Sequence, residues 1–147
     1  MADAPGRPAG PLVDALVQTA FSTMAVLNRV AGDHQLSLTQ LRVLAIVRDR
    51  RVRLTVLADH LGLEKSTVSG LVDRAVGRGL LERVRDPGDG RAAVVAITSA
   101  GEALAQRLHA EVERSMAPLT ATLRPRERDR LTALLLQLLG EPSDAGS

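Results

Sequence analysis

The chain has no cysteine, and Phe21 is the only aromatic side chain among its 147 residues. Without cysteine it cannot form a disulfide, a zinc site with thiolate ligands or a thiol redox sensor. Without aromatic side chains it lacks the flat faces on which proteins stack the bases of single-stranded nucleic acid. The histidines, His34, His60 and His109, are not at metal-ligand spacing. We therefore expect no metal site, and a core of leucine, valine and alanine.

The sequence also lacks the marks of membrane proteins and enzymes. No apolar run approaches the ~20 residues that a membrane-spanning helix needs. Residues 1–11 are rich in Ala, Gly and Pro without an apolar centre, so we expect no signal peptide there. There is no Ser/His/Asp or Cys/His arrangement and no Gly-rich phosphate loop, which makes an enzyme the least favoured class. These absences favour a cytoplasmic protein with no membrane contact, no catalytic residues and no cofactor.

The central segment of the chain, by contrast, is basic. The net charge is only +2, but residues 40–92 carry eleven basic and seven acidic side chains, a net charge of +4. Residues 1–39 and 93–147 each carry a net charge of −1. A basic segment between near-neutral flanks suggests contact with a polyanion, although an ordinary solvated surface remains open at this point.

The N-terminal part is predicted to be a long helix. Residues 12–31 place apolar side chains at spacings of three and four, and Gly32 and Asp33 end the pattern. The apolar stripe is wide, which is typical of a helix that has a second packing partner.

Two further helices are expected near the C-terminus. Thr98 is a good N-cap for a long helix to about Met116, which Pro118 should kink or end. The last helix should begin near Pro125, a residue favoured in a first helical turn, and it carries a narrow leucine stripe.

The middle of the chain has the pattern of a helix-turn-helix. Ser37 and Gln40 form a capping box at the start of one helix, and residues 52–54 are short and extended. Thr55 is a plausible N-cap for a short helix that Gly62 ends, because glycine adopts the left-handed turn conformation easily. A further helix then covers Lys65–Arg78, with Gly79 as its C′ residue.

A β-hairpin is predicted directly after this helix. Leu80–Arg85 is extended by composition, Asp86–Gly90 is turn chemistry throughout, and apolar residues alternate from Ala93 to Ile97. The expected loop has five or six residues. Arg91 at this loop suits the minor groove of DNA, and Asp89 can hold Arg91 extended by a charge-assisted hydrogen bond.

The predicted apolar face of Lys65–Arg78 leaves the opposite face exposed, with small hydroxyl side chains at its N-terminal end. Such residues, together with the free amides of a helix N-terminus, can approach phosphates and base edges. The alternatives to DNA contact are that this helix face is only solvated and that the loop with Arg91 is an ordinary surface loop. The candidate DNA-binding residues are Thr55, Lys65, Ser66, Thr67, Ser69, Gly70, Arg74, Asp89 and Arg91.

At this point the sequence resembles the MarR family of bacterial transcriptional regulators. The similar segments are LADHLGL (57–63), STVSGLVDR (66–74), GLLER (79–83), DPGDGRA (86–92) and VAITSAG (95–101). The resemblance implies a mostly α fold with a small β-hairpin wing, in which a winged helix-turn-helix is joined to long dimerisation helices. It divides the chain into a disordered tail (1–11), an N-terminal dimerisation helix and linker (12–36), the DNA-binding lobe (37–98), C-terminal dimerisation helices (99–140) and a second tail (141–147).

The resemblance also implies a homodimer that places a recognition helix in the major groove and Arg91 in the minor groove. Dimer symmetry would require an inverted-repeat operator in double-stranded DNA. Independently of the family, the apolar stripes at the two ends need cover, from a partner or within one chain. The residues expected at the dimer interface are Leu16, Ala20, Leu131, Leu134, Leu135 and Leu138.

Three residues depart from the family pattern. Gly70 stands where many members carry arginine or another long polar residue, and Gly90 stands where a second wing arginine is frequent, so both thin the basic surface. Glu64 is a poor N-cap, and its negative charge lies on the expected DNA side. These departures bear on affinity and sequence preference and leave the fold unaffected.

Two functions from different classes follow. The first is a dimeric repressor that a small, often aromatic or anionic, effector releases from DNA. The second is a winged-helix module that binds protein instead of DNA. The sequence does not identify the effector site; the residues expected near a pocket between the dimer helices and the lobe are Met24, Asn28, Arg29, His34 and Arg42.

Overall fold

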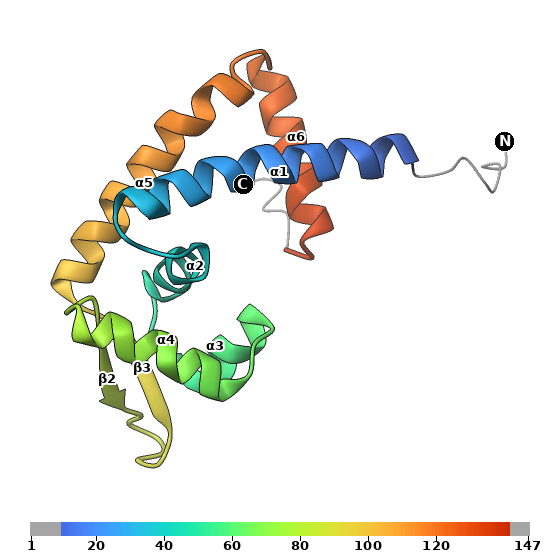
Figure 1. Ribbon diagram of the computed structural model, residues 1–147. Coiled ribbons are helices and arrows are strands. Elements are labelled where there is room, and N and C mark those ends of the chain that lie inside the picture. Colours follow the sequence, from blue (N-terminus) through green and yellow to red (C-terminus); the bar gives the residue numbers. More distant parts are fainter. Residues whose placement is uncertain (1–9, 142–147) are drawn as a thin grey trace, which may run out of the picture. The chain divides into compact units, whose positions relative to one another are not determined.

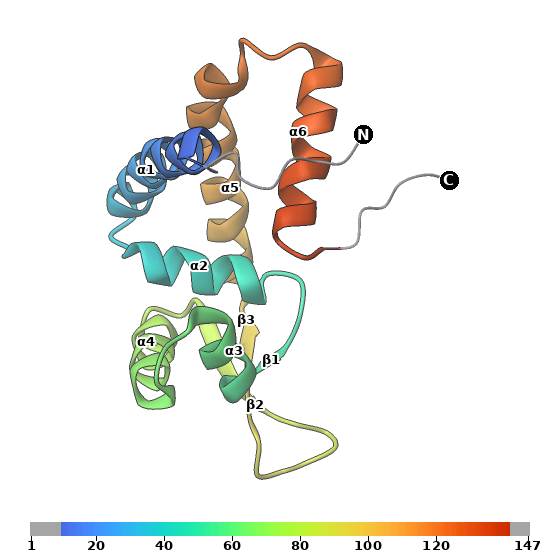
Figure 2. The same ribbon diagram turned by 90° about the vertical axis from the view of Figure 1, so that its right-hand side faces the viewer.

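The structure is a computed structural model that describes residues 10–141 (Figures 1 and 2). Its elements in chain order are α1 (Gly10–Asp33), α2 (Leu38–Val47), β1 (Val52–Arg53), α3 (Leu54–Leu61), α4 (Lys65–Gly77), β2 (Leu81–Arg85), β3 (Ala93–Ile97), α5 (Ser99–Thr120) and α6 (Pro125–Leu138). The predicted class, mostly helical with a small wing, is confirmed. Most of each predicted tail lies outside the described residues. The chain forms two compact units, Met1–Val112 and Glu113–Ser147.

One aliphatic core holds the first unit together. It joins the end of α1 to α2, α3, α4, the sheet and the first half of α5. Its most deeply buried side chains are Leu57, Leu81, Leu108, Val30, Val47, Val68, Val72 and Val95. No polar side chain is buried among residues 10–141. The stability of this unit therefore rests on aliphatic area removed from water, worth about 25 cal/mol per Å².

The sheet has three antiparallel strands in the order β1–β3–β2. The hairpin of β2 and β3 pairs Leu81 with Ile97 and Arg85 with Ala93, as expected, and β1 adds Val52 opposite Val95. The loop between β2 and β3 has seven residues, 86–92, so the predicted five or six was too short. In Figure 1 this hairpin extends past α3 and α4, away from α2.

Several helix ends follow local chemistry as predicted. The Ser37–Gln40 capping box is present in both directions, at 3.1 and 2.8 Å. Gly62 and Gly79 both have positive φ, 64° and 74°, and end their helices as only glycine does without strain. The Thr98 hydroxyl accepts a hydrogen bond from the Gly101 N–H at 3.0 Å, which caps α5.

Three predicted helix boundaries were wrong. Thr55 is not an N-cap, because α3 begins at Leu54 and the extended residue before it is Arg53. α5 continues past Pro118 to Thr120, since a proline in the last turn costs too little backbone hydrogen bonding to end the helix there. α1 begins at Gly10, two residues inside the predicted tail.

Gly101 is required where α5 crosses the end of the turn before β2. A Cβ atom on Gly101 would lie 2.1 Å from the Leu80 carbonyl oxygen and 2.8 Å from Ile97 Cγ1. The backbones therefore approach more closely than any side chain allows. This contact fixes the first turn of α5 against the wing.

α1 is more apolar than the sequence analysis allowed. Residues 15–28 carry no charge, and an 18-residue window of α1 has a mean hydropathy of 1.3. Among the helices of residues 10–141, α1 alone has the length and composition of a membrane-spanning helix, so the expectation that no run comes close was wrong. Only Val30 and Ala31 of α1 are buried.

The second unit contains the end of α5 and α6. No residue of α6 is buried, and its leucine stripe stands exposed: Leu131 41%, Leu134 41%, Leu135 42% and Leu138 64%. Pro125 occupies the first turn as predicted.

Candidate nucleic-acid interface

α3 and α4 form the helix-turn-helix through small and branched side chains. Leu57 and Ala58 of α3 are buried together with Val68 and Val72 of α4. The Leu63 N–H returns to the Ala58 carbonyl at 3.1 Å, so the chain reverses within three residues between the helices. The buried face of α4 fixes which face remains exposed.

The exposed face of α4 carries the predicted residues. Lys65, Ser66, Thr67 and Arg74 are exposed, whereas Ser69 and Gly70 are half-buried. Glu64 precedes the helix and makes no side-chain cap hydrogen bond, in agreement with the sequence analysis. The first turn of α4 therefore presents backbone amides, hydroxyls and one ammonium group, which is a suitable surface for phosphate and base edges.

A groove at the helix-helix turn brings three of these residues together. It has a volume of about 650 Å³ and is lined by Thr55, Ala58, Asp59, Gly62, Leu63, Glu64, Lys65 and Thr67. Thr55 thus faces the same hollow as Lys65 and Thr67, from the second position of α3. Asp59 and Glu64 add negative charge to this hollow, which Lys65 offsets only in part.

Arg83 on β2 ties the wing to the recognition helix. Its Nη2 donates to Asp73 Oδ1 at 2.7 Å and to the Ser69 hydroxyl at 3.1 Å. The side chain of Ser69 is therefore engaged inside the protein, which the sequence analysis did not foresee. Asp73 lies on the exposed side of α4, so its ion pair with Arg83 offsets negative charge on that surface.

Arg74 lies back along its own helix. Its Nε donates to the Gly70 carbonyl at 3.3 Å. A Cβ on Gly70 would meet Arg74 Nη2 at 3.9 Å, an ordinary contact. A Cβ at this position would therefore fit beside the Arg74 guanidinium, and the helix does not need glycine for backbone reasons.

The wing loop is organised by two aspartates. Asp89 Oδ1 accepts from the backbone N–H of Arg91 at 3.0 Å, so the predicted charge-assisted hydrogen bond is present and it shapes the turn through the backbone. Asp86 Oδ1 accepts from the Gly88 N–H at 3.0 Å. Arg91 is exposed, and its guanidinium is available beyond the turn.

Asp86 also joins the wing to the sheet edge. Its carboxylate pairs with the Arg53 guanidinium of β1. The Gly88 N–H and the Arg53 guanidinium lower the pKa of Asp86 below its ordinary value, because both favour the carboxylate. Sequence reasoning missed this pair, since the partners are 33 residues apart and no local pattern links them.

A separate cavity lies within the first unit between α1, α2 and α5. Its volume is about 180 Å³, and it is lined by Leu27, Leu41, Leu44, Ala45, Arg48, Ala105, Leu108, His109 and Val112. None of Met24, Asn28, Arg29, His34 and Arg42 lines it. His34 instead bonds Glu111 Oε1 at 2.9 Å, and Arg42 bonds the His60 carbonyl at 3.0 Å.

A family model and a known repressor are similar to this chain. The MarR family model matches residues 34–92. The HTH-type transcriptional repressor NicR of Pseudomonas putida is 28% identical over 124 residues, covering 83% of this chain and 78% of that protein.

Solved structures show the same fold. BpsR of Bordetella bronchiseptica, whose DNA binding is regulated by 6-hydroxynicotinic acid, is 26% identical with a TM-score of 0.72 and covers 97% of this chain and 100% of its own. A MarR variant from E. coli in complex with operator DNA is 26% identical with a TM-score of 0.68, covering 90% of this chain and 94% of its own.

Proposed function

Because residues 34–92 match the MarR family model and the chain is similar to MarR in sequence and fold, we propose that it is a homodimeric repressor of the MarR family that a small molecule releases from double-stranded DNA. α4 would read bases in the major groove, and Arg91 of the wing would enter the flanking minor groove. Such a regulator works in the cytoplasm, where its operator lies.

The observation that carries this proposal is the joint presentation of α4 and the wing. Arg83 bonds Asp73 and Ser69, and Asp86 bonds Arg53, so the wing is joined to α4 and to the edge of the sheet. A helix and a wing presented together suit the neighbouring major and minor grooves of a duplex. The basic excess of residues 40–92 adds attraction to phosphate.

Within this surface the roles of the candidate residues differ. Lys65, Ser66, Thr67, Arg74 and the backbone at Gly70 would contact base edges and phosphates along α4. Thr55, which lies on α3, would contact a phosphate. Ser69 would act through Arg83, and Asp89 through the turn that carries Arg91.

Dimerisation is proposed from the uncovered apolar stripes. Leu16 and Ala20 of α1 are exposed, as are Leu131, Leu134, Leu135 and Leu138 of α6. Contiguous exposed apolar surface of this kind marks an interface. A second copy would cover both stripes and set two recognition helices about one helical turn (~10 bp) apart.

The effector is proposed to bind the cavity between α1, α2 and α5. A cavity of about 150 Å³ is enough for one benzene ring, and this one is lined mostly by aliphatic side chains. Arg48 supplies a cation at its wall for an anionic group. A one-ring organic anion fits this chemistry, and the aromatic acid that regulates BpsR belongs to that class.

The alternative function is a winged-helix module that binds protein. Asp59 and Glu64 beside the turn groove are the residues that favour it, because they oppose DNA. Duplex binding at several salt concentrations separates the two. A repressor binds a duplex selected from a random library with sub-micromolar affinity and a steep salt dependence. If no duplex, including DNA upstream of its own gene, binds below micromolar at low salt, the repressor proposal fails.

A further inference from the structure

One side chain joins the end of the recognition helix to the corner between α1 and α2. Arg78, the C-cap residue of α4, donates from Nη1 to the Gln35 carbonyl and from Nη2 to the His34 carbonyl, both at 3.1 Å. Within residues 10–141, these two bonds are the hydrogen bonds that link α4 to residues 34–37. We call this contact the Arg78 clamp.

The corner that Arg78 holds has an unusual backbone. Gln35 has φ 59°, the one non-glycine residue with positive φ in the described part of the chain. Side chains disfavour this region, so such a residue persists where its surroundings hold it. The turn directs two successive carbonyls at the same guanidinium, whose planar fork suits a pair of acceptors.

The corner is also tied to α5. The His34 ring nitrogen Nε2 bonds Glu111 Oε1 at 2.9 Å, and both side chains are more than two-thirds buried, with 21% and 29% of their surface exposed. Glu111 on α5, His34 at the corner and Arg78 at the end of α4 therefore form a continuous series of contacts. Every member lies within the first unit.

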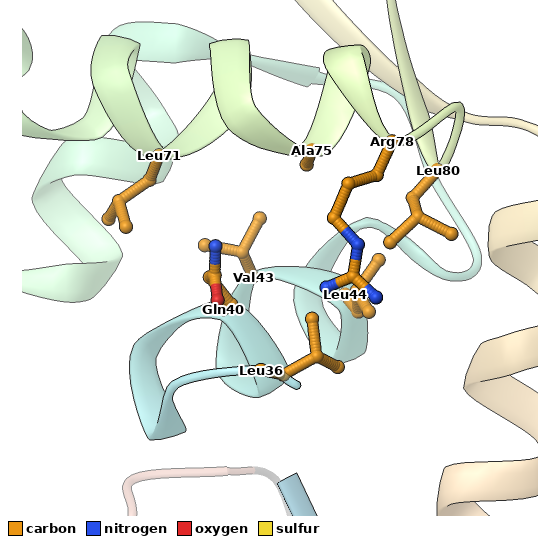
Figure 3. Close-up of a pocket in the computed structure, with 8 residues that line it drawn as sticks. All are labelled: Leu36, Gln40, Val43, Leu44, Leu71, Ala75, Arg78 and Leu80. Atoms are coloured by element: carbon orange, nitrogen blue, oxygen red, sulfur yellow. The ribbon is translucent and has the colours of Figure 1, made fainter. Parts of the chain in front are cut away.

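Apolar side chains pack directly beside the clamp. Figure 3 shows Leu71, Ala75, Arg78 and Leu80 on the α4 side facing residues of the corner and α2 across a small pocket. The lining on that second side is Leu36, Gln40, Val43 and Leu44. The pocket has a volume of about 10 Å³, no more than one water molecule needs, so the apolar side chains of the two faces lie close together there. The two bonds of Arg78 add a directional contact to this packing at the end of α4.

We propose that Arg78 is a positioning residue for DNA recognition, which sets the orientation of α4 and couples it to α5 through His34 and Glu111. It does not touch DNA in this role. The inference rests on the proposed DNA binding by α4. Its consequence is a loss of sequence discrimination, with little loss of general attraction to DNA, when the clamp is broken.

The first test compares two duplexes. Wild-type protein selects a duplex from a random library, and a scrambled duplex of the same length serves as the second probe. Arg78→Lys keeps the charge but cannot reproduce the fork, so we expect affinity for the selected duplex to fall about fivefold. Affinity for the scrambled duplex and the melting temperature should stay unchanged.

The matched control is Arg50→Lys, because Arg50 makes a single local bond to the Ile46 carbonyl at 3.3 Å. It should alter neither affinity. An equal loss on both duplexes, or no loss, for Arg78→Lys would overturn the proposal. If the wild type enriches no duplex at all, the proposed function itself fails, which is a different and earlier result.

The second test asks whether α5 acts through the clamp. Glu111→Ala removes the His34 contact and should lower the selected-to-scrambled affinity ratio in the wild type but not further in Arg78→Lys. Gln106→Ala, an exposed change on the same helix, is the control. Additive effects of the two substitutions would refute the coupling. Restoration of discrimination by Gln35→Gly in the Arg78→Lys protein would show that Arg78 only relieves backbone strain.

Discussion

Apolar side chains are buried in the winged-helix lobe but exposed on α6. The lobe buries Leu57, Val68, Val72 and Val95 completely, whereas α6 has a regular leucine stripe and buries none of its residues. The buried positions on α3 and α4 and the stripe of α6 share helical periodicity, so periodicity alone does not distinguish a covered apolar face from an uncovered one. What differs is whether another element of the same chain covers the apolar face.

α1 combines the two behaviours in one helix. Val30 and Ala31 at its C-terminal end belong to the core of the lobe, while Leu12, Val13 and Phe21 are exposed at 59%, 49% and 66%. The helix therefore begins as an uncovered apolar surface and ends as part of a folded unit. The buried core therefore lies in the lobe, whereas the proposed dimer interface lies at the uncovered ends.

The largest expected effect comes from ending the chain after Leu123, which removes α6. Without the leucine stripe we expect a monomer by light scattering, with more than about tenfold weaker binding to an inverted-repeat duplex because the second half-site is no longer linked. The lobe should retain its helical circular dichroism. A truncated protein that still has the mass of a dimer would contradict the proposed interface.

A pair of leucine substitutions compares the two regions directly. Leu57→Ala should lower the free energy of unfolding by about 2–5 kcal/mol, because it opens a cavity in a fully buried site. Leu138→Ala should leave unfolding of the single chain within about 0.5 kcal/mol and instead raise the dimer dissociation constant. Denaturant titrations and sedimentation at several concentrations measure the two quantities. An equal loss of unfolding free energy in the two variants would contradict the distinction between the buried leucine and the exposed one.

Two glycines test the same contrast at the backbone level. Gly101→Ala forces a Cβ against the Leu80 carbonyl and should destabilise the protein by about 1–3 kcal/mol. Gly32→Ala in α1 meets nothing within 4 Å and should stabilise by about 0.5–1 kcal/mol through helix propensity. Thermal unfolding of both variants measures these two changes in stability. A neutral Gly101→Ala would mean that α5 can move away from the wing.

Arginines of the lobe and of α6 should differ in DNA binding. Arg91→Ala should weaken binding to most duplexes and reduce the salt slope by about one, whereas Arg126→Ala on α6 should change neither. Thr67→Ala should alter sequence preference more than overall affinity; Ser69→Ala should act through its bond to Arg83. Unchanged affinity for Arg91→Ala would show that the wing stays outside the groove.

The smallest expected effect concerns acid. The pKa of Asp86 is lowered in the folded protein by the Gly88 N–H and Arg53, so its contribution is present at neutral pH and is lost as the pH falls below about 4. We expect the Gly88 amide to lose protection from hydrogen exchange over that range. In Asp86→Asn this acid transition should be absent, because no carboxylate remains to titrate.

Sequence reasoning succeeded where the causes are local. The capping box at Ser37, the left-handed glycines Gly62 and Gly79, and the helix over Lys65–Arg78 depend on residues within a few positions of one another. The hairpin strands were also predictable, because alternation and turn residues lie side by side in the chain.

Sequence reasoning failed where a contact joins distant residues. Arg83 with Asp73, Arg53 with Asp86 and Arg78 with the α1–α2 corner are separated by 10 to 44 positions. Each involves an arginine whose long side chain could reach several partners. The prediction of Thr55 as an N-cap failed because β1 pairs with β3 through Arg53 and α3 begins at the next residue, Leu54.

The sequence by itself determined the class of the fold, the order of its elements and the kinds of side chain exposed on α4. Periodicity, caps and turns depend on residues that are neighbours in the sequence. Tertiary structure alone decided how the wing is fastened to α4, why Gly101 cannot carry a side chain and which carbonyls Arg78 holds. Those depend on three-dimensional approach between segments, and charge and length of a side chain do not specify its partner until the core has brought the segments together.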